Sequence, residues 1–304
     1  MRIALPLLLA LAGTSLSAHG VSEWTEPRAL SPFDLMVIAA LSLSGALYAI
    51  GSWKLRAAGA RRRRFEPIAF GLGWMALMIA VLPPLDGLAI QLFSAHMGQH
   101  ELMMLVGAPL VMAGRPLPVW VTGLPSTLKP AAVRLLQAGP TTSSWRWLTT
   151  PVVACALHGL AIWVWHLPVA YDAAVRNEAV HVVQHVSFVG TSIFFWWGLL
   201  YGRYGRAGYG AAVLYVFATA VHTGLLGAMV TFAGAPLYDV YLQPAAARGI
   251  DPLGDQQVAG LLMWVPAGLI FTALGIALFS AWIGESERRG RIPTARPLPS
   301  NKIP

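Results

Sequence analysis

KLRAAGARRRRF, residues 54–65, is the stretch of sequence that decides how this chain folds. It carries six basic residues and separates two long apolar stretches, 33–53 and 66–83. About 20 mostly apolar residues are enough for a helix to cross a bilayer. Loops rich in lysine and arginine remain on the cytoplasmic side of a membrane. The segment therefore predicts two membrane-spanning helices joined by a cytoplasmic loop.

The composition of the 304-residue chain supports the same class. Hydrophobic residues make up 56% and charged residues 11%, with a mean hydropathy of +0.61. A soluble domain carries about 25% charged residues. The net charge of +8 comes from short basic runs between apolar stretches, a pattern of cytoplasmic loops that argues against nucleic acid as a partner. The single cysteine, Cys155, excludes a disulfide framework and a thiolate metal cluster.

Seven apolar segments are long enough to be membrane-spanning helices, so the sequence predicts an all-α, polytopic helical bundle over residues 33–283. The segments are 33–53, 66–83, 92–113, 151–167, 182–201, 209–233 and 257–283. The loops and tail of one side hold 17 of the 21 Lys and Arg residues, and the other side holds Arg28, Arg176 and Arg248. This asymmetry predicts a protein of a bacterial-type inner (plasma) membrane, with the mature N-terminus outside and the C-terminus in the cytoplasm.

The chain begins with a basic residue, an apolar core and small residues, which are typical of a secretory signal peptide. We expect cleavage after Ala18, with an uncleaved first helix as the alternative. Residues 19–32 then form an extracytoplasmic segment. The basic tail 284–304 has no apolar periodicity and is expected to be disordered in the cytoplasm. Within the longest loop, 114–150, residues Lys129–Gln137 predict a short amphipathic helix on the membrane surface.

Histidines gather at one depth of the predicted bundle. Ionisable side chains inside a membrane are costly, so each of them marks a candidate functional site. The predicted topology puts at least five of the eight histidines near the outer leaflet. His96 and His100 form one pair four residues apart, and His181 and His185 form another. Residues four apart share a helix face, so two such pairs at one depth predict a metal or haem site between helices.

The residues around the histidine pairs favour copper. Imidazole suits copper and zinc alike, and the thioethers of Met97, Met103 and Met104 add a preference for copper. Haem is the alternative, because helical membrane bundles also hold haem between histidines. The absence of a C-x-x-C-H motif excludes covalent haem, and the four-residue spacing favours a compact metal site. A further interpretation is that the histidines only tie helices together through hydrogen bonds.

Three motifs follow one another along the chain. They are HMGQHELMMLVGAPLVMAGRP (96–116), AYDAAVRNEAVHVVQHVSFVGTSIFFWW (170–197) and DPLGDQQVAGLLMWVPAG (251–268). In this order they resemble the polytopic, caa3-type CtaG family of cytochrome c oxidase assembly factors, which has seven spans. The resemblance covers most of residues 30–285 and implies a role in assembling a haem–copper oxidase, at the step of copper insertion. The positions that it marks are His96, Gln99, His100, His181, His185, Asp255, Gln256, Met263 and Trp264.

Together, the spacing and the resemblance predict one group of candidate site residues near the outer leaflet. The predicted metal ligands are His96, His100, His181, His185, His166, Asp255, Met97 and Met263, with Gln99, Glu101, Gln256 and Trp264 as accessory residues. The resemblance leads us to expect an apolar residue where Glu101 stands, so Glu101 is a ligand, a partner for His100 or a local departure without a role. Asp255 has the alternative role of an N-cap for its own span.

The functional expectation is an assembly factor that receives copper from outside and passes it to a haem–copper oxidase subunit, together with other assembly factors. No Ser–His–Asp order, P-loop or paired acidic site indicates an enzyme. The alternatives are a haem-binding membrane electron carrier, a transporter and a metal-free scaffold for oxidase assembly. The inner halves of the predicted spans are nearly free of ionisable groups, which argues against a transporter.

Overall fold

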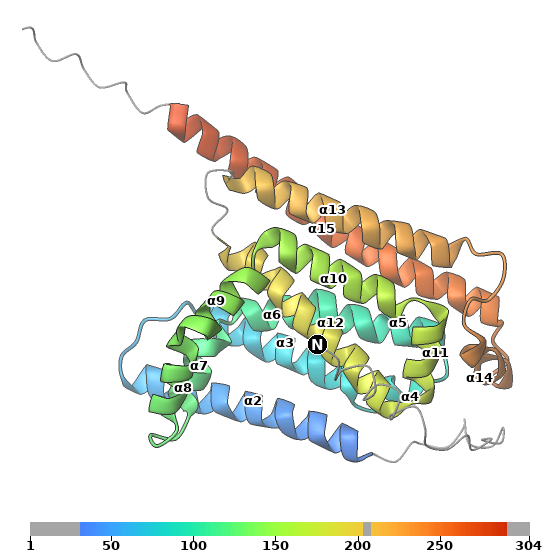
Figure 1. Ribbon diagram of the computed structural model, residues 1–304, viewed down its shortest axis with the longest axis horizontal. Helices are drawn as coiled ribbons and strands as arrows, with labels where there is room; N and C mark the ends of the chain where they lie inside the picture. The colour runs from blue at the N-terminus through green and yellow to red at the C-terminus, as the bar shows by residue number, and fades with distance from the viewer. Residues whose placement is uncertain (1–30, 203–207, 291–304) are drawn as a thin grey trace, which may run out of the picture.

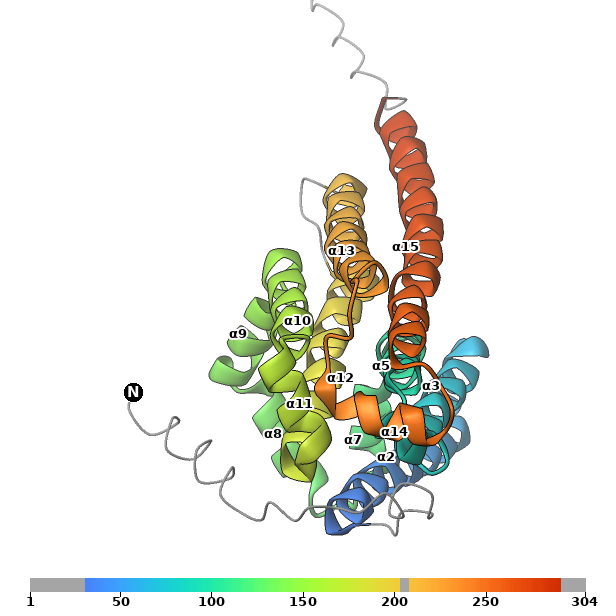
Figure 2. The same cartoon turned by 90° about the vertical axis from the view of Figure 1, so that its right-hand side faces the viewer.

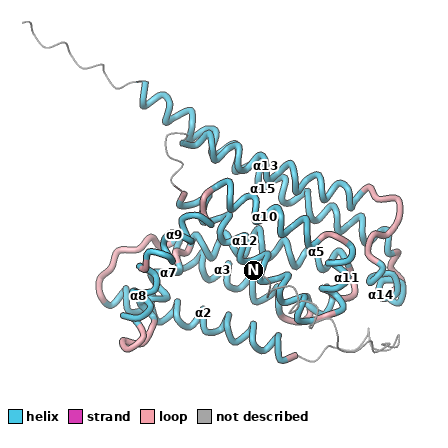
Figure 3. Tube along the Cα trace, viewed as in Figure 1, coloured by secondary structure: helices cyan, strands magenta, loops and turns pink. Residues whose placement is uncertain are grey.

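The computed structural model describes residues 31–202 and 208–290, and in this part of the chain all regular structure is helical (Figures 1 and 3). The predicted all-α bundle is therefore confirmed. The elements are α2 (Pro32–Ala57), α3 (Phe65–Val81), α4 (Leu85–Ala89), α5 (Phe93–Glu101), η2 (Leu102–Gly107), α6 (Ala108–Ala113), α7 (Pro116–Gly123), α8 (Lys129–Gln137), α9 (Gly139–Leu148), α10 (Pro151–Trp165), α11 (Pro168–Arg176), α12 (Glu178–Tyr201), α13 (Gly208–Thr231), η4 (Asp239–Tyr241), α14 (Leu242–Ala247) and α15 (Pro252–Gly290).

A helix lies at each of the seven predicted spans. Helices α2, α12, α13 and α15 are long and apolar enough to cross a membrane, and two bent pairs bring the number in the described residues to six. In one pair the continuous helix Phe93–Ala113 bends by 65° into α7, and in the other α9 bends by 70° into α10. Helix α3, at the second predicted span, is a shorter apolar helix of 17 residues. By the length and composition of its helices, the chain is a multi-pass membrane protein.

The structure tests only some of the predicted domain boundaries. The signal peptide 1–18 and the cleavage after Ala18 lie outside the described residues, as does the tail from residue 291 onward. Helix α15 continues to Gly290, which is beyond the predicted end of the last span at residue 283. The amphipathic helix predicted over Lys129–Gln137 is α8, and none of its residues is buried.

Figure 1 shows α7, α8 and α9 together at one end of the bundle, and α4, α11 and α14 at the other.

The third span contains a π-helical turn that hydropathy cannot reveal. Helix α5 passes into η2 at Leu102 and returns to α-helical geometry in α6. Single π-helical turns inside α-helices are rare and frequently occur at functional sites. The carbonyl oxygen of Met104, within this turn, accepts a hydrogen bond of 2.8 Å from Trp196 Nε1 on α12. A backbone group inside a membrane needs such a partner because there is no water to supply one.

Helices α13 and α15 lie side by side along one edge of the bundle (Figures 1 and 2). Small residues let the two backbones approach. A Cβ atom on Gly260 would lie 2.6 Å from the backbone nitrogen of Thr231, and one on Gly227 would lie 2.7 Å from Cβ of Trp264. The Ala-Gly-x-x-Met-Trp part of the third motif is thus a close-packing surface, of the small-residue type that membrane helices use.

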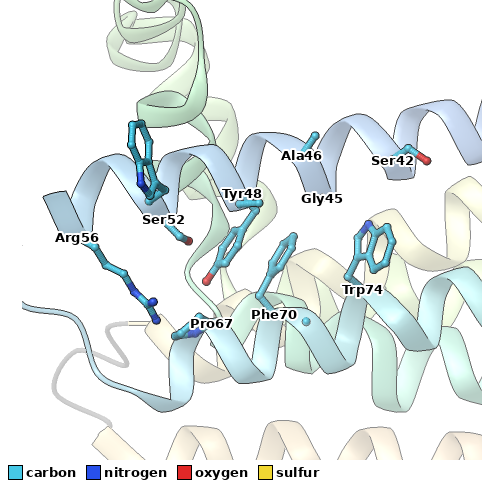
Figure 4. Close-up of a pocket in the computed structure, with 12 residues that line it drawn as sticks. Ser42, Gly45, Ala46, Tyr48, Ser52, Arg56, Pro67, Phe70 and Trp74 are labelled. Atoms are coloured by element: carbon cyan, nitrogen blue, oxygen red, sulfur yellow. The ribbon is translucent and has the colours of Figure 1, made fainter.

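At the predicted cytoplasmic end, one partly buried arginine joins three helices. Arg62 donates to Tyr48 Oη at 2.8 Å and to Ser52 Oγ at 3.1 Å, and it pairs with Glu66 at 3.2 Å. Tyr48 in turn donates to the carbonyl of Gly114 at 2.8 Å. Beside this cluster, a cavity of about 630 Å³ runs between α2 and α3, and Figure 4 shows Tyr48 among the side chains that line it.

The close contact of α13 with α15 predicts opposite effects for two glycine-to-alanine changes on α15. Gly260→Ala should lower the stability of the fold by about 1–3 kcal/mol, because the added methyl group meets the backbone of α13. Gly268→Ala meets nothing within 4 Å and should be neutral or stabilise by up to about 1 kcal/mol, since glycine weakens a helix. Thermal unfolding of the two variants in one detergent measures both. Equal melting temperatures would contradict the packing of Gly260.

Candidate metal centre

Three histidines from two helices converge in the interior of the bundle. His96 comes from α5, and His181 and His185 come from successive turns of α12. Within the described residues they are the one group of three potential ligands whose donor atoms all lie within 4.8 Å of one another. Their ring centroids are 4.1 Å apart for the pair on α12, and 5.2 Å and 6.3 Å from His96 to His181 and His185. The two predicted pairs therefore meet, with His96 as the member of the first pair that joins the second.

The orientation of the His96 ring is fixed by hydrogen bonds behind it. Its Nδ1 lies 3.2 Å from the carbonyl oxygen of Ala89 and 2.8 Å from Tyr241 Oη. A carbonyl can only accept, so Nδ1 carries the proton and Nε2 keeps its lone pair. Tyr241 Oη also donates to the Ala89 carbonyl at 3.0 Å and lies 3.2 Å from Tyr171 Oη. Metal-binding histidines in proteins are oriented in this way, by a partner on the nitrogen that does not bind the metal.

His100 adjoins the three histidines without belonging to their close group. Its Nε2 lies 3.0 Å from Nε2 of His96, and its ring centroid is 5.3 Å from that of His185. Because Nε2 of His96 holds a lone pair, Nε2 of His100 is the donor in this contact. The ring packs edge-on against Phe188 on α12, at a centroid distance of 4.7 Å. His100 thus lies beside the group, close to both His96 and His185.

Asp255, a predicted ligand, instead caps the N-terminus of α5. Its Oδ2 accepts from the backbone nitrogens of Phe93 at 2.7 Å and Ser94 at 3.4 Å, and its Oδ1 accepts from the Ser94 hydroxyl. No side chain of α5 itself performs this role. Asp255 is therefore an N-cap, as the alternative interpretation held, but for the third span and not for its own. Sequence could not reveal this, because the two segments are 162 residues apart.

Two further predicted residues, Gln99 and Gln256, hold the backbone around the site. Gln99 donates to the carbonyl of Ala80 at 2.6 Å and to Asp86 Oδ1 at 3.0 Å, which joins α5 to α3 and α4. The Oε1 atom of Gln256 accepts from the backbone nitrogen of Leu237 at 2.6 Å, and its Nε2 donates to two carbonyls near the end of α13.

The remaining predicted residues lie at a second, smaller cavity or in the packing of the bundle. His166, Met97, Met263 and Glu101 line a cavity of about 20 Å³ between α5, α10, α13 and α15. Trp264 packs against Gly227. The structure also shows residues that sequence reasoning missed, namely Tyr171, Tyr241 and Asp86. Tyr171 lies inside the second motif, but nothing in the sequence marks Tyr241 as the partner of His96.

A groove leads to the histidines from the side of the bundle. It has a volume of about 560 Å³, lies between α2, α3 and α12, and is lined by both His181 and His185. Most of its wall is apolar, and three carboxylates, those of Asp34, Asp86 and Glu178, also line it. Carboxylates beside imidazoles raise the local concentration of cations. The groove thus gives the three histidines an opening that a closed interior site would lack.

Residues 46–285 match the family model described as cytochrome c oxidase caa3 assembly factor, Caa3_CtaG. The chain belongs to this family. The match contains both histidine pairs, Asp255 and the C-terminal part of α2, and it confirms the resemblance of the three motifs.

Relatives of this family member are distant. Uncharacterized proteins of Mycobacterium bovis and Mycobacterium tuberculosis are each 24% identical to it over 273 residues, which is 84% of this chain and 40% of each relative. The chain thus spans about 40% of the length of these curated relatives. No solved structure matches this chain.

The cap on α5 predicts a specific loss of stability. Asp255→Ala should lower the free energy of unfolding by about 1–2 kcal/mol, because backbone donors at the start of α5 then lose their acceptor. Asp251→Ala is the comparison variant, since Asp251 is an exposed residue just before α15 that accepts from the backbone nitrogen of Gly254 in the first turn of that helix. Thermal unfolding in detergent should show the larger decrease for Asp255→Ala. A larger effect of Asp251→Ala would show that the contact across the bundle contributes little.

Proposed function

We propose that this caa3-type assembly factor binds copper at His96, His181 and His185 and assists its insertion into a haem–copper oxidase subunit. The observation that carries the proposal is the convergence of these three imidazoles inside a membrane bundle. The family supplies the oxidase and the assembly role. The copper ion, the transfer step and the individual partners are our inference from the donor atoms and the groove.

The donor set suits a copper ion. Three neutral imidazoles without a thiolate fit Cu(I) and Cu(II), and among first-row divalent metals Cu(II) binds nitrogen ligands most tightly. The hydrogen bond from His96 Nδ1 to the Ala89 carbonyl leaves Nε2 as the nitrogen with a lone pair, which accepts from His100 in the structure. Zinc also binds to three histidines. Which of the two metals occupies the site therefore depends on which one is delivered to it.

The groove supports transfer by exchange of ligands. His181 and His185 line it, whereas His96 does not. A histidine of an oxidase helix lying in the groove would meet the metal on the side where the two α12 ligands are. The ion could then pass from one set of imidazoles to another within the membrane. This is a binding and positioning role and requires no catalytic residue.

The proposed orientation places the site near the outer surface of the inner membrane. Basic residues of the loop between α2 and α3 stay in the cytoplasm, and the histidines lie toward the opposite ends of α5 and α12. Copper would therefore arrive from outside, and oxidase subunits and other assembly factors would be met in the plane of the membrane.

A metal-free scaffold is the second candidate, and one observation favours it. The contact of His96 with Tyr241 joins α5 to η4, and it is the kind of hydrogen bond that a histidine with a packing role alone would make. In this candidate function the groove would receive an oxidase helix without any metal. The two functions are separated by measuring copper binding and oxidase assembly in the same variants.

Removal of the α12 ligands should abolish the proposed site. The double variant His181→Ala, His185→Ala leaves His96 alone of the three, and its affinity for Cu(I) at this site should fall by roughly tenfold or more. The measurement is competition with bicinchoninate for Cu(I) under anaerobic conditions. His222→Ala, on α13 and outside the group, is the matched control. Unchanged copper binding in the double variant would rule out the site.

Oxidase assembly in cells separates a copper donor from a scaffold. A strain that lacks this protein and expresses the double variant should produce a haem–copper oxidase with less copper and less activity than with the wild type. Copper per oxidase in purified membranes is the measurement, with membrane levels of the assembly factor matched. Full oxidase activity with a variant that binds no copper would establish the scaffold instead.

Filling the groove should block assembly without affecting copper binding. Val186 lines the groove, and Val183 on the same helix does not, although both are exposed. Val186→Trp should reduce oxidase activity because the bulky ring occupies the space of a partner helix, whereas Val183→Trp should not. Both variants should keep Cu(I) affinity. Equal oxidase activity in the two variants would contradict docking in the groove.

A further inference from the structure

A second set of donor atoms surrounds the small cavity beside α5. Met97 and Glu101 follow His96 and His100 by one residue, which places them about 100° further around the helix. The cavity has a volume of about 20 Å³, slightly more than a water molecule needs. Its lining residues are Met97, His100, Glu101, Met104, Ile162, His166, Thr223, Leu226 and Met263. They include two imidazoles, one carboxyl group and three thioethers.

Three polar atoms at this cavity are buried and have no hydrogen-bond partner. They are Nδ1 of His100, Nε2 of His166 and Oε2 of Glu101. His100 and His166 are 1% and 7% exposed, so water does not satisfy them at the surface. Buried polar atoms without partners are rare in proteins, and several around one cavity indicate a missing ligand.

The hydrogen bonds of His166 and His100 to other groups determine which nitrogen of each imidazole carries a lone pair. Nδ1 of His166 lies 2.7 Å from the carbonyl oxygen of Ile162, so it carries the proton and Nε2 does not. Nε2 of His100 donates to His96, as derived above, so its Nδ1 is the unprotonated nitrogen. Both unpartnered nitrogens are therefore electron-pair donors, and both belong to residues that line the cavity.

We infer that this cavity is a second metal site, one that takes a single Cu(I) ion. Imidazole nitrogen and thioether sulfur are ligands that Cu(I) prefers over harder cations. The ligands would be Nε2 of His166, Nδ1 of His100 and the sulfurs of Met97 and Met263, with Glu101 beside them. The donors do not form a group as tight as the three histidines of the first site. Methionine side chains are flexible enough to close on an ion.

Glu101 would have a role at this second site. This residue follows His100 in the chain and lines the same cavity. A carboxylate would offset the charge of a bound cation in a region where charge is costly. The second site uses His100, which contacts His96 of the first site but is not one of its three ligands.

X-ray absorption at the copper edge tests the second site directly. Protein in detergent is saturated with Cu(I) under anaerobic conditions, and the number of bound ions and their nearest atoms are measured. The wild type should bind two Cu(I) per chain and show sulfur neighbours. Met97→Leu with Met263→Leu should bind one Cu(I) with nitrogen neighbours only. Leucine replaces methionine with little change of volume, so the fold should persist, and thermal unfolding verifies it.

Two controls make the outcomes distinct. Met229→Leu changes a methionine on α13 that is exposed and does not line the cavity, and it should leave the sulfur signal unchanged. His181→Ala, His185→Ala should retain one Cu(I) with sulfur neighbours, since only the first site is removed. A wild-type spectrum without sulfur, or a sulfur signal that persists in the Met97→Leu, Met263→Leu variant, would overturn the second site. A variant that loses copper with nitrogen neighbours but keeps copper with sulfur neighbours has lost the first site and retained the second.

Discussion

The bond between the Asp255 carboxylate and the first backbone N–H groups of α5 is the interaction on which the site depends. The first N–H groups of any helix lack partners within the helix, and inside a membrane water cannot replace them. Asp255 supplies the acceptor from α15. The contact fixes both the depth at which α5 begins and its rotation. His96 and His100 lie one and two turns further along, so their positions follow from a carboxylate on another helix.

Hydrogen bonds to nitrogen atoms determine where the lone pairs of the histidines point. The Ala89 carbonyl holds the proton of His96 on Nδ1, and the Ile162 carbonyl holds that of His166 on Nδ1. Each bond uses a backbone group that the fold already positions, so the orientation of the rings requires no additional charged residue. Such an arrangement suits a membrane interior, where a carboxylate behind each histidine would be costly. The site is thereby composed almost entirely of neutral groups until a cation enters.

The sequence predicted those features that depend on residues close to one another in the chain. Hydropathy and the basic loops predicted the positions of the seven apolar helices, and the bounds of α8 agree with the amphipathic segment Lys129–Gln137. The four-residue spacing predicted the helix face that His181 and His185 share. What it could not predict depends on contacts between distant segments, such as the cap from Asp255, the partner Tyr241 of His96 and the separation of His166 from the three histidines. The π-helical turn after Glu101 also leaves no periodic signal in the sequence. It depends on a contact between distant segments, since the carbonyl oxygen of Met104 accepts a hydrogen bond from Trp196 on another helix.

His100 links the two cavities through its two nitrogens. In the structure, Nε2 donates to His96 while Nδ1 presents a lone pair at the second cavity. A cation on Nε2 of His96 would take the lone pair that accepts this hydrogen bond. His100 would then lose its partner, and transfer of its proton from Nε2 to Nδ1 would turn it into a ligand for the first site. That same transfer removes its lone pair from the second cavity. Occupancy of either site must therefore change the affinity of the other, and by equal factors, because coupling of binding free energies is reciprocal.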